Sequence, residues 1–300
     1  MKALAAYIMR GRAQAIGFTT GFAILSLIFP LLSVVSAAAV GLVTQRLGPS
    51  PGMLLVTSSS LAALAMTMLV ANTAFAIPAI GSLILLLLLT WMASTLLRFT
   101  RSLPMAIMAL TGVGMVVIVL FHLMVGDPVT WWQAHFDELF ASATESMMAD
   151  QKMVFEQNLE TWASIMTGFV TMAFLLNVVL AMFIARAWQA MLYNPGGFGQ
   201  EFHSLQFGKQ YAVFALVIAS LALLPNSTIG IVSKDILMVV MMVYVLQGIA
   251  VVHSMVAQKG LHWAWLVGLY VLVVTVPQLV AVTGYIDTWM DFRKRVNKTV

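Results

Sequence analysis

The sequence predicts an all-α protein, a polytopic transmembrane helical bundle of eight to nine spans with one external amphipathic helix. Three observations indicate this fold class. Hydrophobic residues make up 61% of the 300 residues and charged residues 9%, whereas an average soluble domain is about 45–50% apolar and about 25% charged. The mean hydropathy is +0.97, and several apolar runs approach the length of about 20 residues that crosses a bilayer. These values exclude a soluble enzyme, a disordered chain and a nucleic-acid-binding protein, and they make the lipid bilayer a partner.

Nine apolar segments divide the chain, which we interpret as a single integral membrane domain, residues 1–300. The segments cover residues 14–29, 31–46, 52–71, 74–97, 103–125, 160–187, 210–225, 232–255 and 262–283. The first two are short and meet at Pro30, which cannot continue a helix without losing a hydrogen bond. Residues 14–46 are therefore either two tight spans or one broken element.

The basic residues predict how the bundle is oriented. If five spans precede residue 126, nine lysines and arginines share one side: Lys2, Arg10, Arg12, Arg46, Arg98, Arg101, Arg186, Lys209 and Lys259. Only Lys152 and Lys234 fall opposite. Because cytoplasmic loops carry an excess of Lys and Arg, we expect a bacterial inner-membrane protein with a cytoplasmic N-terminus. Nine crossings would place the basic tail, 293–298, outside, so one element is not a full crossing. The segment 210–225 is the suspect, and the side of the C-terminus stays open.

Residues 126–160 form the one long polar connection, with seven acidic residues against Lys152. Trp132, Phe136, Leu139 and Phe140 recur at steps of three and four residues, which predicts a helix with one apolar and one acidic face. Such a helix lies in the headgroup layer or caps the bundle. We expect this segment to be external.

No pattern in the chain predicts catalysis, a metal site or a cofactor. The histidines form no HExxH or other four-residue pair, and neither a GxSxG elbow nor a phosphate-binding P-loop is present. We interpret His122 as an ordinary interfacial residue. No Asp, Glu, Lys or Arg lies near the middle of a predicted span, which disfavours ion-coupled transport. We therefore expect a protein that is not an enzyme.

Neutral side chains are then the candidates for substrate binding. The residues that would line a pocket for a small neutral molecule, beneath a cap formed by 131–159, are Ser58, Trp91, Asn177, Gln247 and Gln278. The alternative is that these amides and hydroxyls bond between helices and hold the bundle together.

Two further patterns predict contact with a protein partner. Gly17 and Gly21, and likewise Ala37 and Gly41, place small residues four apart, a spacing that lets helices approach closely. Residues 188–209 form a cytoplasmic elbow that Asn194-Pro195-Gly196-Gly197 breaks. The elbow is either an anchoring loop or a docking site in which Phe198 and Phe202 are anchors and Glu201 is a directional contact.

Four stretches resemble the YybS-like family of bacterial integral membrane proteins, a group classed as a domain of unknown function. They are FPLLSVVSAAAVGLVTQRLGPSPG (29–52), ARAWQAMLYNPGGFGQEFHSL (185–205), VYVLQGIAVVHSM (243–255) and GYIDTWMDFRKR (284–295). The resemblance implies a distant grouping with the substrate-binding (S) components of energy-coupling-factor vitamin transporters. Those components are small helical bundles that hold a vitamin-like molecule and work with an ATPase-driven module. Their small-residue stripes, which meet the coupling subunit, resemble Gly17, Gly21, Ala37 and Gly41, but they usually have six spans.

Two hypotheses follow. The first is an S-component-like subunit that binds a small molecule and passes it inward with the help of a partner. The second is a non-transporting membrane scaffold in envelope assembly that presents residues 194–207 to other proteins. An enclosed mid-membrane cavity would favour the first, whereas a filled core with an exposed apolar patch at Phe198 and Phe202 would favour the second.

Overall fold

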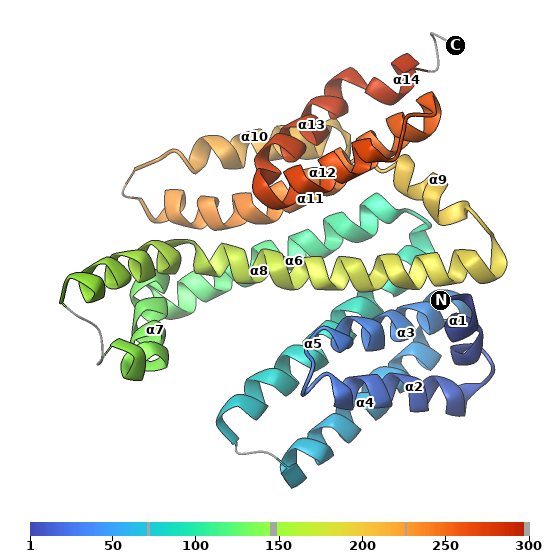
Figure 1. Ribbon diagram of the computed structural model, residues 1–300, viewed down its shortest axis with the longest axis horizontal. Coiled ribbons are helices and arrows are strands. Elements are labelled where there is room, and N and C mark those ends of the chain that lie inside the picture. Colours follow the sequence, from blue (N-terminus) through green and yellow to red (C-terminus); the bar gives the residue numbers. More distant parts are fainter. Residues whose placement is uncertain (71–72, 145–148, 226, 297–300) are drawn as a thin grey trace.

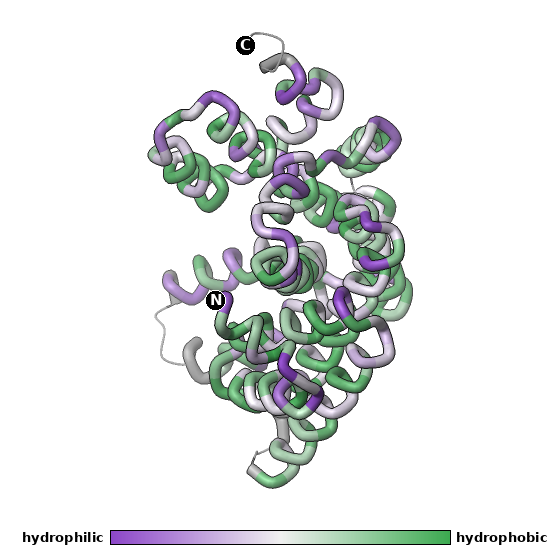
Figure 2. Tube along the Cα trace, turned by 90° about the vertical axis from the view of Figure 1, so that its right-hand side faces the viewer, coloured by the Kyte–Doolittle hydropathy of each residue, from purple (hydrophilic) through white to green (hydrophobic). Residues whose placement is uncertain are grey.

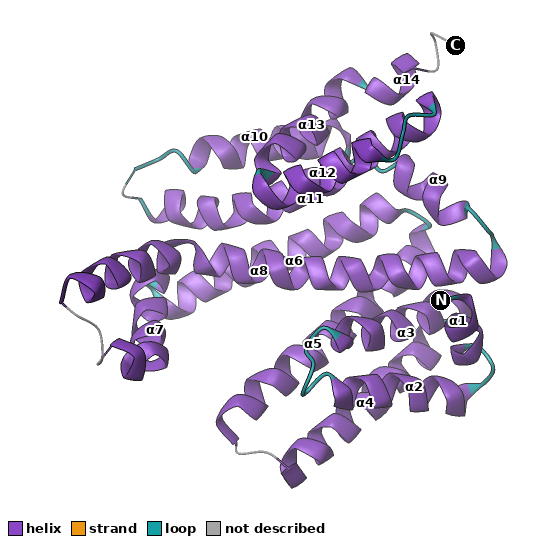
Figure 3. Cartoon of the chain, viewed as in Figure 1, coloured by secondary structure: helices purple, strands orange, loops and turns teal. Residues whose placement is uncertain are grey.

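The computed structural model describes residues 1–70, 73–144, 149–225 and 227–296, and within these ranges the chain forms helices and no strands (Figure 3). The helices are α1 (Lys2–Ile8), α2 (Arg12–Leu25), α3 (Leu32–Leu47), α4 (Pro49–Val70), α5 (Thr73–Thr100), α6 (Leu103–Val125), α7 (Pro128–Thr144), α8 (Ala149–Tyr193), α9 (Gly197–His203), α10 (Gly208–Leu221), α11 (Thr228–Lys259), α12 (Ala264–Thr275), α13 (Pro277–Met290) and α14 (Phe292–Val296). The predicted all-α class is confirmed for the described residues.

Five of these helices are long and apolar enough to cross a membrane: α4, α5, α6, α8 and α11. A sixth candidate is the pair α12 and α13, which bends by 112° at a short break. The break lies at Val276, directly before Pro277, where a proline disfavours a helical conformation in the residue that precedes it. The protein is therefore a multi-pass membrane protein with five or six candidate spans by length and composition.

The segment on either side of Pro30 forms two helices that lie side by side (Figure 1). The chain reverses through residues 26–31, and Ser36 Oγ donates a 2.9 Å hydrogen bond to the Thr19 carbonyl across the pair. With 14 residues in α2 and 16 in α3, both are shorter than the five long helices. Of the two alternatives for residues 14–46, the structure has two separate helices.

Small residues allow the central helices to approach closely. Gly41 of α3 faces Ala185 of α8, where an added Cβ would lie 2.8 Å from the alanine Cβ. Gly168 of α8 lies against the backbone of Asp235 in α11, and Gly248 of α11 lies against the Val280 carbonyl of α13. Close backbone contact of this kind is typical of membrane helix packing.

The long helices run between two ends of the bundle (Figure 1), and most of the basic residues lie at one of them. We call the end where α3, α5, α8, α11 and α13 finish the cationic end, since it carries Lys2, Arg10, Arg12, Arg46, Arg98, Arg101, Arg186, Lys209, Lys259, Arg293 and Lys294. The opposite end, which we call the acidic end, carries Lys152 and Lys234 with Asp127, Asp137, Glu138, Glu156, Glu160 and Asp235. Figure 2 views the molecule from the cationic end, where hydrophilic stretches join largely hydrophobic helices.

At the acidic end, α7 packs on the first turns of α8. Trp132 Nε1 donates a 2.9 Å hydrogen bond to Thr167 Oγ1, and the rings of Phe140 and Phe155 lie 5.6 Å apart. Asp127 accepts a hydrogen bond from Thr130, which lowers the pKa of this exposed carboxyl. Residues 126–160 thus form a pair of helices rather than one, with 145–148 outside the described residues.

Candidate functional site: a basic pocket at the cationic end

A pocket of about 620 Å³ opens at the cationic end, where the ends of α3 and α5 meet α8 and α9. Its wall is mostly polar, and Leu97 and Phe99 are the apolar members. The other lining residues are Gln45, Arg46, Arg98, Arg101, Arg186, Gln189 and Glu201. Four arginines and one glutamate leave an excess of three positive charges. The volume lies in the range of about 300–1,000 Å³ that small-molecule sites usually have.

Arg98 is held by the end of α3. Its Nη1 donates hydrogen bonds to the carbonyls of Gln45 (2.7 Å) and Arg46 (3.0 Å). The last carbonyls of a helix have no partner within the helix and carry partial negative charge, so a guanidinium is a favourable partner there. This contact fixes the position of Arg98 and joins α3 to α5.

Arg186 is paired with Glu201. Arg186 Nε lies 2.7 Å from Glu201 Oε2, a second guanidinium nitrogen contacts Oε1, and a third contacts Gln189 Oε1. This paired contact joins α8 to α9 across the Asn194–Gly197 break. Arg186 and Glu201 largely cancel each other in charge.

Arg46 and Arg101 leave their charge uncompensated. The Arg46 guanidinium lies 4.1 Å from the centroid of the Tyr193 ring, a cation–π contact that leaves its N–H groups available. In the described part of the chain, the exposed Arg101 side chain has neither an ion pair nor a hydrogen bond. Gln45, which is about nine-tenths buried, lines the same pocket, and its Oε1 has no hydrogen-bond partner.

The backbone at Arg101 is strained. Its φ is +53°, in the left-handed region that non-glycine residues rarely adopt. The residue joins α5 to α6, directly before Ser102, whose hydroxyl caps α6 by accepting from Met105 N. A side chain that tolerates this cost at a pocket wall is a candidate for function.

The expected substrate residues do not gather around one cavity. Ser58 Oγ donates to the Leu55 carbonyl of its own helix, Trp91 Nε1 donates to the Pro49 carbonyl at 2.8 Å, and Gln278 is exposed. Asn177 donates to Ala173 within α8 and lines an open cavity of about 340 Å³ near the 26–31 turn. Ser58, Trp91, Gln247 and Gln278 do not line this cavity.

Gln247 belongs instead to a network that we call the C-terminal network. Its Nε2 donates to Asp287 Oδ2 and to Thr288 Oγ1, both at 3.1 Å, and its Oε1 accepts from Phe207 N. Arg293 closes the network with a 2.6 Å contact to Asp287 Oδ2, and its other amino group donates to the carbonyls of His203 and Leu205. Gln247 and Asp287 are fully buried. The alternative interpretation, an amide that bonds between helices, therefore describes Gln247 in this structure.

The expected partner residues divide into an outward and an inward group. A Cβ added at Gly17 or Gly21 would meet nothing within 4 Å, so that face of α2 is open, whereas Ala37 and Gly41 are buried within the bundle. Phe198 and Phe202 are half-buried, and each ring lies 5.6 Å from Phe183. The elbow aromatics thus pack against α8 rather than forming an exposed patch.

His122, which lies in the last turn of α6, has a partner that the sequence does not indicate. It is buried, and its Nε2 lies 2.7 Å from Asp235 Oδ2. Asp235 Oδ1 in turn accepts from Gly168 N at 3.0 Å. The pair joins α6 to α11 near the acidic end. His122 and Asp235 are 113 positions apart in the chain, so no local sequence pattern indicates that they pair.

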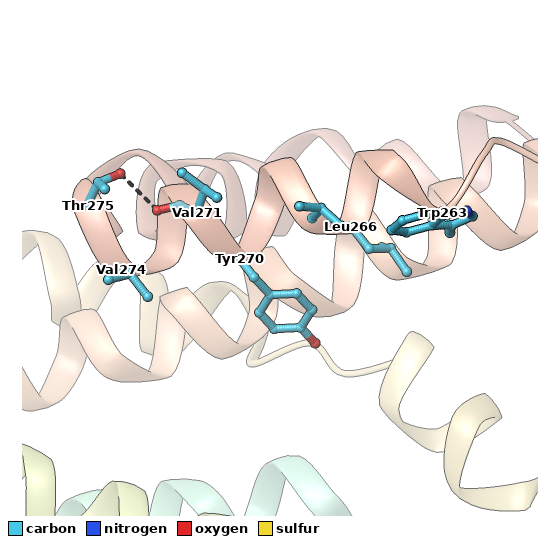
Figure 4. A pocket seen from close by; sticks show the side chains of 7 residues that line it. Trp263, Leu266, Tyr270, Val271, Val274 and Thr275 are labelled. Carbon is cyan, nitrogen blue, oxygen red and sulfur yellow. Dashed lines mark hydrogen bonds between the residues drawn. The ribbon is translucent and has the colours of Figure 1, made fainter.

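A shallow apolar groove of about 690 Å³ follows α12 (Figure 4). Trp263, Leu266, Tyr270, Val271 and Val274 line it, and the Tyr270 hydroxyl bonds His253 of α11 at 3.0 Å. Exposed apolar side chains of this kind are ordinary on a surface that faces lipid. The groove holds no group that recognises a particular ligand.

Comparison with known proteins gives no relative from which a function can be transferred. No family model, no curated protein and no solved structure matches the chain.

The four basic residues of the pocket are visible in the sequence, where they indicate only the orientation of the chain in the membrane. Their convergence depends on helix ends that lie far apart in the chain.

Proposed function

We propose that this chain is a multi-pass protein of the bacterial inner membrane with both termini in the cytoplasm. The distribution of Lys and Arg between the two ends supports this orientation. Eight of the described helices, α2 to α6, α8, α10 and α11, would each cross once, and α12 with α13 would enter and return to the same side. The element that is not a full crossing would then be α12 with α13, in place of the segment 210–225 suspected from the sequence. This count lies within the predicted eight to nine spans and places the basic tail with the other cytoplasmic charges.

Three of these crossings are short. Helices of 14 to 16 residues, α2, α3 and α10, extend about 21–24 Å, compared with a hydrocarbon core of about 30 Å. Local thinning of the bilayer and polar side chains that reach the interface accommodate such a mismatch. Residues 126–160 would then lie outside as the expected amphipathic segment, with the apolar rings of α7 against α8 and the acidic side chains in water.

The function that the geometry supports best is binding of an anionic small molecule at the cytoplasmic face. The basic pocket carries this proposal, because it combines a ligand-sized volume with several uncompensated charges, unlike the three other cavities with which it is compared. The ligand class thus changes from the neutral molecule expected from the sequence to an anion. The site also moves from the middle of the membrane to its inner surface.

A role in uptake with a partner subunit is the second candidate. The open face of α2 around Gly17 and Gly21 favours it, since small residues at this spacing suit close approach by another helix. In an S-component-like subunit the basic pocket would be the inner end of the path, where the molecule is released. The scaffold hypothesis has less support, because Phe198, Phe202 and Glu201 are engaged within the chain.

The test is native mass spectrometry of the full chain purified in mild detergent, recording both small molecules and proteins that co-purify. We expect an anionic molecule in about equal amount to the protein, lost when Arg46 and Arg101 are both replaced by Ala. A stoichiometric protein partner without any small ligand would contradict the binding proposal and favour the scaffold. A ligand retained by the double variant would place the site elsewhere.

A further inference from the structure

We propose that the basic pocket recognises a phosphomonoester, presented either as the head group of an anionic lipid or as a soluble sugar phosphate. This inference rests on the proposed binding of an anion and names its chemical class. The charge of the pocket and the directions of its donors favour a doubly charged tetrahedral anion over a monocarboxylate, and the apolar side chain at its rim favours an ester over free sulfate.

The charge of the pocket favours a doubly charged ligand. Glu201 balances Arg186, which leaves Arg46, Arg98 and Arg101 as three cations around about 620 Å³. A phosphomonoester carries a charge of about −1.5 to −2 near neutral pH, whereas a phosphodiester, like a monocarboxylate, carries a single charge. The monoester therefore compensates most of the excess, and a singly charged group compensates a third of it.

The three guanidinium groups come from three places. Arg46 lies in the last turn of α3, Arg98 lies in the last turn of α5, and Arg101 lies in the connection to α6. Donors that converge from several directions suit the tetrahedral oxygens of a phosphate, since one planar fork already satisfies a carboxylate. Arg98 keeps N–H groups free, because one of its nitrogens makes both carbonyl contacts.

Arg101 gives the strongest indication that the pocket requires a positive charge. Glycine would occupy its left-handed backbone position without strain, and the Arg101 N–H that bonds the Leu97 carbonyl at the end of α5 would remain in a glycine. The arginine side chain makes no hydrogen bond or ion pair within the described residues, so a contact to a ligand is the reason we infer for an arginine at this strained position.

The mouth of the pocket suits an ester that carries further groups. Phe99 lines the pocket and is 72% exposed, so it provides an apolar surface beside the arginines. This surface fits a phosphate joined to glycerol or to a sugar, with or without acyl chains.

The experiment measures binding to the full-length protein in detergent by isothermal titration and native mass spectrometry. The probes are glycerol 3-phosphate, phosphatidic acid, phosphatidylglycerol, phosphatidylcholine, sulfate and citrate. The test variant is Arg101→Ala, which keeps a Cβ at the same φ and so leaves the backbone strain unchanged. Arg12→Ala is the matched control, because Arg12 is an exposed arginine at the same end that lines none of the cavities described above.

We expect a monoester to bind best and Arg101→Ala to weaken it about tenfold or more, the usual effect of losing a hydrogen bond to a charged group, while Arg12→Ala binds like the wild type. Binding of phosphatidic acid without glycerol 3-phosphate identifies a lipid, and binding of glycerol 3-phosphate identifies a soluble ester. If sulfate or citrate binds as well as the monoesters, the phosphate inference is wrong and anion binding stands. If no anion binds, both fail.

Discussion

The basic pocket and the C-terminal network lie at the same end of the bundle. The charged side chains of the network are paired within the chain, whereas two arginines of the pocket have no acidic partner. In the network, the buried carboxylate of Asp287 contacts Arg293 and Gln247, and Arg293 Nη1 donates to two backbone carbonyls. In the pocket, Arg46 and Arg101 face a cavity without an acidic partner. Burying a polar group costs free energy unless the group is hydrogen-bonded, and burying a charge costs more unless it is paired.

Arginine residues therefore have two different roles at this end of the bundle, one in stability and one in binding. A completed network holds α11, α13 and the loop after α9 together, so its loss is expected to cost stability. A pocket with surplus charge and unfilled volume gains its partners from outside, so its loss is expected to cost binding. Variants that affect one property without the other test this division.

The largest effect is expected from Asp287→Asn. Removal of one charge leaves Arg293 buried without a counter-charge, and a buried pair broken in this way loses about 3–5 kcal/mol. Thermal unfolding in detergent would measure the loss. Asp291→Asn is the control, because Asp291 pairs with Lys294 at the surface, where an ion pair contributes about 1 kcal/mol or less. Equal losses in both variants would mean that the network is no more important than a surface pair.

Gly168→Ala should have the next largest effect. The new Cβ would lie 2.7 Å from the Asp235 Cα, a backbone atom that cannot turn away, so α8 and α11 must separate and the His122–Asp235 pair must shift. Overpacking of this kind costs about 1–3 kcal/mol. Gly17→Ala is the matched substitution at an open helical position, and its melting temperature should equal or exceed that of the wild type. A stable Gly168→Ala protein would contradict the close contact.

The sequence predicts a great deal of this fold, because hydropathy and proline are local signals. Each of the nine apolar segments contains a helix, and Pro30 marks a true break between two of them. The span count is less well predicted, since α2, α3 and α10 are apolar but short, and their status depends on neighbours. Residues 262–283 are expected as one segment, but the structure bends by 112° before Pro277, and the return of α13 along α11 depends on Gly248 and Gly284.

The candidate site is predicted poorly, for a physical reason. Arg46, Arg98 and Arg186 each lie near a helix end, and only the packing of α3, α5 and α8 brings them together. Charge at helix ends is expected of any membrane protein, so the same residues carry an orientation signal that conceals a binding signal. Gln247 illustrates the converse, a polar residue in an apolar helix whose partners are within the chain.

Arg101→Gly should move stability and binding in opposite directions. Glycine removes the strain at φ +53° and raises stability by about 1 kcal/mol, while anion binding falls as it does in Arg101→Ala. Chemical unfolding and titration on the same preparation would measure both. A glycine variant that unfolds more easily than the alanine variant would show that the arginine supports the turn, and the functional argument from strain would then fail.

The smallest effect is expected from acidification, through His203 at the junction of the two regions. Burial lowers the pKa of His203 from its ordinary value of 6.5, and its carbonyl accepts from Arg293 of the network. The unfolded chain then binds a proton more readily than the folded one, so the stabilisation is complete above pH 6.5 and declines as the pH falls toward the folded pKa. We expect the melting temperature to drop by no more than about 3 °C between pH 7.5 and 5.5, and less in His203→Gln.

The ring of His253 lies 6.3 Å from the ring of His203, so a variant that removes both rings should show a smaller pH dependence still. Should His203→Gln keep the full dependence, the acid sensitivity belongs to other groups and the junction plays no part in it.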